Sequence, residues 1–478
     1  MIGAGPPLTP DICVVGAGSA GLSVAAAAAQ FGTPVVLVEK GTMGGDCLNT
    51  GCVPSKSLIA AAAIREAGRR GPSFGVAQSE PAVDFAGVHR HIHEVIAAIA
   101  PHDSVERFEG LGVTVLRDHA RFLDDRTLKA GDTLIRPRRF VLATGSRPAV
   151  PPIPGLDGVP FLTNETVFDL ATCPGHLLVV GGGPIGVELA QAYRRLGAEV
   201  TLIERSTLLA RDDPFLVAPV REALVADGVR LLEQTGIERV EGNAGAIAAT
   251  VTGLAGRETI RGTHLLVAAG RAPVVDGLDL EKAGIAHSPA GIETDRGLRT
   301  SNRRVYAIGD CVGGPQFTHV AGYHAGLVVR SILFRLPVRV DYSHLPRVTY
   351  CDPELGQVGL SEAEARERFG DRVRVLDAPF AENDRARAER RTEGGVRIVA
   401  GPRGRILGVG IVGPGAGELI AGWSLALAAG ANLRTVVGHV APYPTFFESG
   451  KTAAITAYSG SLTNPWLRRI LRWLSRLG

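Results

Sequence analysis

Residues 44–56 read GGDCLNTGCVPSK and place two cysteines, Cys47 and Cys52, five positions apart among glycines, near the start of the chain. The whole chain of 478 residues contains only six cysteines, too few for the disulfide scaffold of a small secreted protein. A close pair in such a chain is more typical of catalysis or metal binding than of a structural bridge. The sequence around the two cysteines is needed to decide between catalysis and metal binding.

An alternation of strand and helix precedes the cysteines. Residues 11–39, DICVVGAGSAGLSVAAAAAQFGTPVVLVE, run from an apolar strand through a glycine turn and an alanine-rich helix into a second apolar strand that ends at Glu39. Gly16, Gly18 and Gly21 match the fingerprint of a dinucleotide-binding βαβ unit, in which glycines allow a tight turn and let the backbone approach a pyrophosphate. Glu39 is then expected to accept a ribose hydroxyl. Taken alone, the motif could also be a glycine-rich turn without a ligand.

Residues 177–204, LLVVGGGPIGVELAQAYRRLGAEVTLIE, repeat this pattern of strand, glycine turn, helix and strand. The glycines of the second turn are Gly181, Gly183 and Gly186. Two such units imply two dinucleotides. Glu204, which ends the second strand, can hold the adenosine ribose hydroxyls and would repel a 2′-phosphate, so it favours NADH. The neighbouring Arg205 could partly offset that repulsion, which leaves NADPH open.

Three further apolar strands end in glycine turns. VLATGSRP (141–148) and VAAGRAP (267–273) lie where the chain is expected to pass between domains. VYAIGDC (305–311) places Asp310 at a strand end, where its carboxylate can bond a ligand hydroxyl. The candidate nucleotide contacts on these turns are Thr144, Gly145, Gly270 and Asp310.

The order of these motifs resembles the pyridine nucleotide-disulfide oxidoreductases over nearly the whole chain. This flavoenzyme family includes dihydrolipoamide dehydrogenase, glutathione reductase and mercuric reductase. The resemblance implies an α/β homodimer with two Rossmann-like dinucleotide-binding domains and a C-terminal α+β dimerisation domain. The implied bounds are 1–150 and 273–342 for the two parts of the FAD-binding domain, 151–272 for the NAD(P)-binding domain and 343–460 for the dimerisation domain.

The resemblance also implies the chemistry. FAD is expected against the first βαβ unit and Gly45, with Cys47 and Cys52 forming a disulfide against the flavin ring. Cys52 is the implied flavin-facing thiolate, and Cys47 is the outward thiol that meets the substrate. Lys56 and Glu188 match an ion pair beside the reactive flavin nitrogen. Because a nicotinamide gives up two electrons at once and a dithiol accepts two, a flavin between them can pass charge from one to the other.

Two other interpretations of the cysteine pair are a metal clip and two idle thiols. A structural zinc site would need further ligands at paired spacing, which the remaining cysteines do not provide, so no metal site is expected. These are Cys13, Cys173, Cys311 and Cys351, expected to be small buried residues. Asp46 departs from the family motif, since many relatives have threonine there. A carboxylate beside Cys47 should disfavour its thiolate unless a nearby cation compensates.

Near the C-terminus, RVTYCDPELGQVGLSE (347–362) and HVAPYPTFFESGK (439–451) resemble the family's dimerisation domain. Relatives that reduce lipoamide or glutathione carry a histidine directly before the proline of the closing motif, where this chain has Tyr443, while Glu448 keeps its place. Imidazole has a pKa near neutrality and suits acid–base work on thiols, whereas a phenol has a pKa near 10. Ordinary disulfide exchange should therefore be slow, unless His439 substitutes.

Mercuric reductase also resembles this chain in having a tyrosine at that position, which favours a soft metal or other thiol-reactive compound as electron acceptor. Against mercury itself, that enzyme ends in a vicinal cysteine pair, and here no cysteine follows Cys351. The alternatives are dihydrolipoamide dehydrogenase, a membrane-associated quinone reductase and, outside the enzymes, a redox-sensing binding protein.

The last residues, 461–478, predict a basic tail helix. Over residues 466–477 the tryptophans, leucines and isoleucine fall on one side of a helix and the four arginines on the other, with Asn464 and Pro465 as its expected start. Such a helix suits an anionic membrane surface, or it docks on the dimer. The rest of the chain is nearly neutral, which argues against nucleic acid as a partner. The N-terminus does not read as an export signal, so a cytoplasmic protein, peripheral on the membrane at most, is expected.

Overall fold

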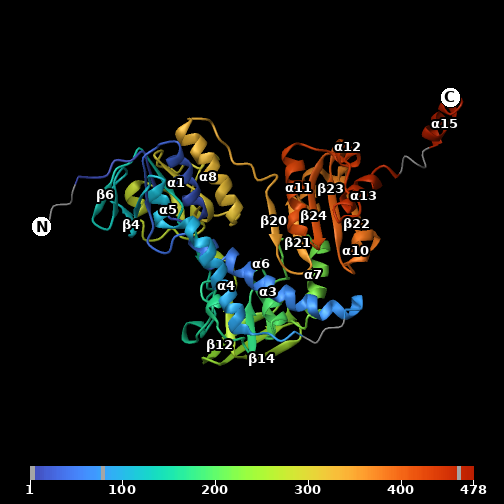
Figure 1. Ribbon diagram of the computed structural model, residues 1–478, viewed down its shortest axis with the longest axis horizontal. Helices are drawn as coiled ribbons and strands as arrows, with labels where there is room; N and C mark the ends of the chain where they lie inside the picture. Colours follow the sequence, from blue (N-terminus) through green and yellow to red (C-terminus); the bar gives the residue numbers. More distant parts are fainter. Residues whose placement is uncertain (1–5, 77–80, 460–464, 478) are drawn as a thin grey trace. The chain divides into compact units, whose positions relative to one another are not determined.

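The computed structural model describes residues 6–76, 81–459 and 465–477. It is a mixed α/β structure (Figure 1), which confirms the predicted fold class, and the chain divides into two compact units. The first unit comprises residues 1–181, 192–203 and 235–340, and the second comprises residues 182–191, 204–234 and 341–478. Both units therefore draw on residues from more than one of the expected domains.

A five-stranded parallel sheet forms the centre of the first unit, in the order β19-β7-β1-β2-β3. Its strands are β1 (Ile12–Val15), β2 (Val35–Val38), β3 (Thr114–Leu116), β7 (Arg139–Leu142) and β19 (Val305–Ala307). Strands β1 and β2 are continuous apolar runs and are buried throughout, as expected of a parallel sheet that is covered on both faces.

Helices cover one face of this sheet and a small antiparallel sheet covers the other. On one face, α1 (Ser19–Gln30) lies beside α8 (Thr318–Leu333) (Figure 1). Residues of both helices share a hydrophobic core with Val14 and Leu37. On the other face, Phe122 meets Phe140 with ring centroids 5.1 Å apart. Phe122 belongs to the sheet of β4 (Ala120–Phe122), β5 (Leu128–Ala130) and β6 (Thr133–Ile135).

The second βαβ unit is also present. Strand β9 (His176–Val180) pairs in parallel with β10 (Glu199–Ile203) and with β15 (His264–Val267), and α6 (Pro184–Arg195) follows β9 in the chain. A separate antiparallel sheet consists of β12 (Gly236–Asn243), β13 (Ala246–Gly253) and β14 (Gly256–Gly262). The two segments expected between domains pair with each other, as β8 (Ser146–Pro148) and β16 (Arg271–Pro273).

The cysteine motif folds as two consecutive helices, α2 (Gly45–Asn49) and α3 (Cys52–Arg70). Helix α3 packs against α4 (Phe85–Ile99) in the first unit. The remaining short elements of this unit are α5 (Val105–Gly110), β17 (His287–Ser288) and β18 (Gly291–Ile292).

The second unit is built on an antiparallel sheet in the order β20-β21-β24-β23-β22. Its strands are β20 (Pro346–Thr349), β21 (Glu354–Gly359), β22 (Arg374–Pro379), β23 (Gly395–Ala400) and β24 (Ile406–Gly413). Trp423 of α11 (Ala416–Ala428) is buried in the core of this unit with Phe380 and Ile411. The helices of this unit are α7 (Pro214–Ala226), α9 (Glu362–Phe369), α10 (Asp384–Ala388), α11 (Ala416–Ala428), α12 (Leu433–Gly438), α13 (Glu448–Thr456) and α15 (Pro465–Leu474), and β11 (Arg230–Leu232) follows α7.

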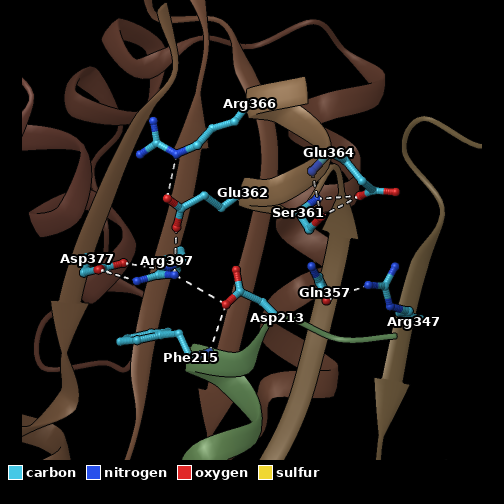
Figure 2. A network of polar contacts seen from close by, with 10 residues as sticks. All are labelled: Asp213, Phe215, Arg347, Gln357, Ser361, Glu362, Glu364, Arg366, Asp377 and Arg397. Carbon is cyan, nitrogen blue, oxygen red and sulfur yellow. Dashed lines mark hydrogen bonds and ion pairs between the residues drawn. The ribbon is translucent and has the colours of Figure 1, made fainter. Parts of the chain in front are cut away.

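An ion-pair network on this sheet centres on Arg397 of β23 (Figure 2). Its guanidinium pairs with Asp377 of β22 at 2.8 Å, Glu362 of α9 at 3.1 Å and Asp213 at 3.4 Å. It also lies 4.0 Å above the ring of Phe215. Asp213 caps α7, because its carboxylate accepts the backbone N–H of Phe215. One arginine thus joins two strands and two helices.

Helix α15 covers Pro465–Leu474 of the predicted tail helix (461–478), and the next two residues form a turn. The last residues of a helix lack backbone donors four positions further on, so the end frays. Asn464, the expected cap, lies outside the described residues. Among the helices that the structure describes, none has the length and apolar character needed to cross a membrane.

Candidate active site

The two helices of the cysteine motif bring the thiols together. Cys47 lies within α2, and Cys52 is the first residue of α3. Asn49 holds the bend before them, since its side chain donates to the carbonyls of Met43 and Gly45 at 3.0 and 2.8 Å. The two thiols are hydrogen-bonded to each other. Both are reduced here; Cys47 is half-buried and Cys52 exposed.

Thr318 supplies the third group of this cluster. Its hydroxyl lies 3.4 Å from the sulfur of Cys52, although the two residues are 266 positions apart in the chain. Thr318 is also the first residue of α8, a helix of 16 residues. The amino end of a helix carries partial positive charge, which favours an anion. Both the hydroxyl and the helix therefore favour a thiolate at Cys52.

The surroundings of the two thiols shift their pKa values in opposite directions. The pKa of Cys52 is lowered to about 6, mainly by the hydrogen bond with Cys47 and also by the Thr318 hydroxyl and the charge of Lys56, against the effects of burial and of Asp46. The same hydrogen bond, together with burial, raises the pKa of Cys47 well above its usual range. At neutral pH the pair of thiols therefore holds one proton.

The first glycine turn has the geometry of a nucleotide cradle. Gly16 has a φ of +104°, and a Cβ there would lie 2.3 Å from the carbonyl oxygen of Ala143. A Cβ on Gly45 would lie 2.7 Å from the Cα of Gly18, so the cysteine helix packs directly on the turn. Glu39 accepts the backbone N–H groups of Ala17 and Gly41, both at 2.6 Å. Bare backbone beside a fixed carboxylate fits the pyrophosphate and ribose of FAD.

The strand-end segments converge on the same region of the first unit. Asp310 accepts a hydrogen bond from Ser146 at 2.6 Å, and burial raises the pKa of its carboxyl while Ser146 and Arg271 oppose the shift. Thr144 donates to the carbonyl of Val274 at 2.6 Å. Of the remaining candidates here, Gly145 and Gly270 have φ values of +73° and +125° and lie at the ends of the paired strands β8 and β16.

The second glycine turn repeats the first. Gly181 takes a φ of +111°, with the carbonyl of Ala268 in the place that Ala143 has in the first turn. Gly183 has open space where a Cβ would lie, and Gly186 is in the first turns of α6. Glu204 accepts the backbone N–H groups of Gly182 and Ser206, both at 2.6 Å. The carboxylate is thus held in the same manner as that of Glu39.

The two members of the expected flavin ion pair each have other described partners. Lys56 donates to the hydroxyl of Ser55 at 3.4 Å. Glu188 is buried, and it accepts the backbone N–H of Tyr350 at 2.9 Å. Gln191, one turn later on α6, exchanges two hydrogen bonds with the backbone of Asp352, each 2.7 Å long. The RVTYCDPE segment therefore fixes the face of α6 that carries Glu188.

In the second unit, Tyr443 is exposed, and its hydroxyl donates to Asp384 at 2.9 Å. This hydrogen bond raises the pKa of Tyr443. Glu448 accepts the backbone N–H of Thr445 at 3.2 Å. His439 is exposed, and its ring meets that of Phe447 edge-on at 5.6 Å. The phenol thus keeps its proton at neutral pH and has a carboxylate as partner.

Sequence reasoning missed Thr318, Arg271 and Asp384. Arg271 pairs with Asp46 at 3.1 Å. It is therefore a nearby cation that compensates the carboxylate beside Cys47. The only available signal was that Arg271 follows a candidate glycine turn and Thr318 follows AIGDC. Within residues 6–76, 81–459 and 465–477, no three histidine, cysteine or acidic side chains gather as metal ligands.

Comparison with known proteins agrees with this geometry. Residues 10–325 match the pyridine nucleotide-disulphide oxidoreductases, and residues 345–454 match the dimerisation domain of that family. The chain is 35% identical over 452 residues to the mercuric reductase of Lysinibacillus sphaericus, covering 93% of this chain and 82% of that one. It is 33% identical over 449 residues to the dihydrolipoyl dehydrogenase of Bacillus subtilis strain 168, covering 92% and 96%.

Among solved structures, the Cu(II) complex of the HOCl-induced flavoprotein disulfide reductase RclA from Escherichia coli superposes with a TM-score of 0.81 at 27% identity. The match covers 92% of this chain and 98% of that chain. The enzymes of the matched family use FAD and NAD(P)H. The chain belongs to the pyridine nucleotide-disulfide oxidoreductase family.

Proposed function

We propose that this enzyme oxidises NADH and delivers the electrons, through FAD and the Cys47–Cys52 pair, to a soft metal ion or another thiol-reactive acceptor. Bound FAD supplies the redox group that takes up a hydride and passes two electrons to a disulfide. The observation that carries the choice of acceptor is Tyr443, which stands where disulfide-reducing relatives have histidine and donates to Asp384.

The unequal thiols suit such an acceptor. Cys52, with a pKa of about 6, is a thiolate at neutral pH, while Cys47 keeps its proton. Thiolate sulfur is a soft ligand and prefers soft metal ions. When a soft cation reaches Cys47, a sulfur–metal bond forms and the thiol proton passes to solvent. Both sulfurs of the reduced pair could then hold the ion.

The protonated phenol argues against a disulfide acceptor. Reduction of a disulfide expels a thiolate that must be protonated, and the attacking thiol needs a base, so a group with a pKa near neutrality does this work best. The pKa of Tyr443 is raised instead. Reduction of a metal ion cleaves no sulfur–sulfur bond of the acceptor, so no leaving group of a disulfide has to be protonated. The similarity to mercuric reductases and to a reductase solved with Cu(II) supports the same choice.

The test is a steady-state screen of the FAD-loaded protein with NADH and each acceptor in turn: mercuric ion, cupric ion, lipoamide, glutathione disulfide and a soluble quinone. Excess free thiol in the mercuric assay keeps that ion from denaturing the protein, and the cupric assay contains no free thiol, because thiols themselves reduce Cu(II) to Cu(I). We expect turnover with a metal ion to exceed turnover with either disulfide by at least about 100-fold, the contribution of a placed acid–base group. Faster turnover with lipoamide or glutathione disulfide would refute the proposal.

The preference for NADH rests on Glu204. Its carboxylate is fixed by two backbone N–H groups at the end of β10, which leaves lone pairs for ribose hydroxyls and puts negative charge where NADPH carries a phosphate. Arg205 is adjacent in sequence and is the group that could reverse this preference.

A second element of the proposal concerns α15. All its described side chains are exposed, including Trp466 at 74% and Trp473 at 60%, and it carries arginines and no acid. An exposed basic helix with tryptophans on its apolar face suits an anionic lipid surface. The matched dimerisation domain supports a homodimer, which carries two such helices.

A further inference from the structure

The residue before Cys47 is an aspartate, and its carboxylate is held from three directions. It pairs with Arg271 at 3.1 Å, and it accepts hydrogen bonds from the hydroxyl of Thr50 at 2.9 Å and from the amide of Asn164 at 3.0 Å. Asn164 also donates to the backbone carbonyl of Thr50 at 3.1 Å. Asp46 is thus a fixed charge within the cysteine motif.

Arg271 is placed as firmly as its partner. Only 13% of its side chain is exposed, and the guanidinium donates to the hydroxyl of Ser146 at 2.8 Å and to the Ser146 carbonyl at 3.1 Å. It also lies 3.9 Å from Asp310. Because β16 pairs with β8, the register of these two strands sets where the guanidinium lies. One cation therefore stands between two carboxylates.

The ion pair between Asp46 and Arg271 affects the thiols because the charge of Asp46 acts on the ionisation of Cys52. The groups that face Cys52 are Cys47 and Asp46 from α2, Lys56 from α3 and the hydroxyl of Thr318 from α8, and Asp46 is the one carboxylate among them that opposes a thiolate. A negative charge next to a thiol disfavours its ionisation, and an opposite charge close to that carboxylate weakens the effect. A partly buried carboxylate without a cation would also be costly in itself.

We propose that Arg271 is a positioning residue of the redox-active dithiol, which neutralises Asp46 and ties the cysteine motif to the paired strands β8 and β16. The ion pair between Arg271 and Asp46 sets the reactivity of the thiols, so Arg271 and Asp46 act as a unit. This inference rests on the family's dithiol chemistry and holds whichever acceptor the enzyme reduces.

The test is a double-mutant cycle on the FAD-loaded protein with its dithiol reduced by dithiothreitol and the reductant removed. The variants are Arg271→Met, Asp46→Thr and the two combined. The first readout is the rate of alkylation by iodoacetamide against pH, in which a thiolate displaces iodide and forms a thioether. The second is the pH midpoint of the long-wavelength thiolate-to-flavin absorbance. FAD content is measured for every variant.

The two single variants should move the midpoint in opposite directions. Arg271→Met leaves Asp46 uncompensated, so the midpoint should rise by about one pH unit, and the thiolate fraction below the midpoint should fall about tenfold. Asp46→Thr removes the carboxylate that opposes the thiolate, so the midpoint should fall. The double variant should match Asp46→Thr and not return to the parent, because Arg271 acts on the thiols through Asp46 and has nothing to neutralise once that carboxylate is gone. The decisive result is this non-additivity.

Arg147 and Asp276 provide the matched control. Arg147 lies on β8 opposite Ala272 of β16, and its guanidinium pairs with Asp276 at 2.8 Å with both side chains largely exposed. Arg147→Met, Asp276→Thr and their combination should leave the thiol midpoint in place. Additive effects of Arg271→Met and Asp46→Thr, or equal shifts in the control cycle, would overturn the inference. If Arg271→Met fails to retain FAD, Asp46→Thr alone decides, since an unchanged or raised midpoint contradicts the proposal.

Discussion

Replacement of Thr318 by valine tests how the protein makes Cys52 acidic. The hydroxyl of Thr318 lies 3.4 Å from the Cys52 sulfur and helps to lower the pKa of this thiol to about 6. Valine has nearly the shape of threonine and keeps the backbone at the start of α8, so the main loss is the hydrogen bond. The thiolate should then form only at higher pH.

The size of the change follows from the geometry. A hydrogen bond to a charged group contributes about 1.5–3 kcal/mol, and the lower end applies here because Cys52 is exposed and a 3.4 Å contact to sulfur is weak. At 1.36 kcal/mol per unit, this corresponds to about one pKa unit. With a pKa of about 6, about nine tenths of Cys52 is thiolate at pH 7. With the pKa about one unit higher, the fraction falls to about half.

The assay is the long-wavelength absorbance of the two-electron-reduced, FAD-loaded protein, followed from pH 5 to pH 9. Thiolate exists above the pKa, so the band should appear as pH rises through about 6 in the parent protein and about one unit higher in Thr318→Val. Thr318→Ser keeps a hydroxyl and serves as the control. Equal midpoints for the valine variant and the parent would show that the hydroxyl does not stabilise the thiolate.

Four further outcomes are expected. Cys52→Ser should abolish the long-wavelength band and Cys47→Ser should keep it; the reverse would exchange the roles of the two thiols. With Glu204 in place, kcat/KM for NADH should exceed that for NADPH, and the opposite ratio would mean that Arg205 dominates. The full-length protein should sediment with anionic liposomes and lose binding as salt rises, since each arginine near such a surface contributes about 1 kcal/mol; equal sedimentation of a protein truncated before Pro465 would contradict this. Tyr443→Phe should slow metal reduction relative to flavin reduction by NADH, and Tyr443→His should raise lipoamide reduction by about 100-fold; fast lipoamide turnover by the parent protein, unaffected by Tyr443→Phe, would falsify the argument.

The parts of the fold that depend on residues close together in the sequence were predictable from the sequence. The strands at Ile12 and at Leu177 are apolar runs followed by glycine turns, and both βαβ units have the predicted form. The cysteine motif was equally plain, because its chemistry lies in 13 consecutive residues. Local patterns of this kind leave a signal because the constraint acts within one turn or one helix.

The polar partners of the site were not predictable, because they come from distant segments. Thr318 reaches Cys52 across 266 positions, and nothing in the sequence near either residue reports that contact. Arg271 stands on a strand whose pairing with β8 decides where its guanidinium goes. Asp384 precedes Tyr443 by 59 residues and meets it only because α10 and the closing motif fold together. Tertiary packing alone creates these contacts.

The contacts of Arg397 bear on what can be cut from this protein. Asp213, which pairs with Arg397, comes from the segment that follows the second glycine turn. Leu216 of α7 comes from the same segment and packs closely on the sheet, since its methyl group would lie 2.4 Å from a Cβ on Gly410. That segment folds with the C-terminal sheet, although residues 235–340 separate residues 204–234 from residues 341–478. A fragment that begins at residue 343 would therefore expose the surface of the sheet that α7 covers. It would also leave Arg397 without Asp213, one of its carboxylate partners. The compact unit that keeps these contacts is discontinuous, and it includes residues 182–191 and 204–234 as well as residues 341–478.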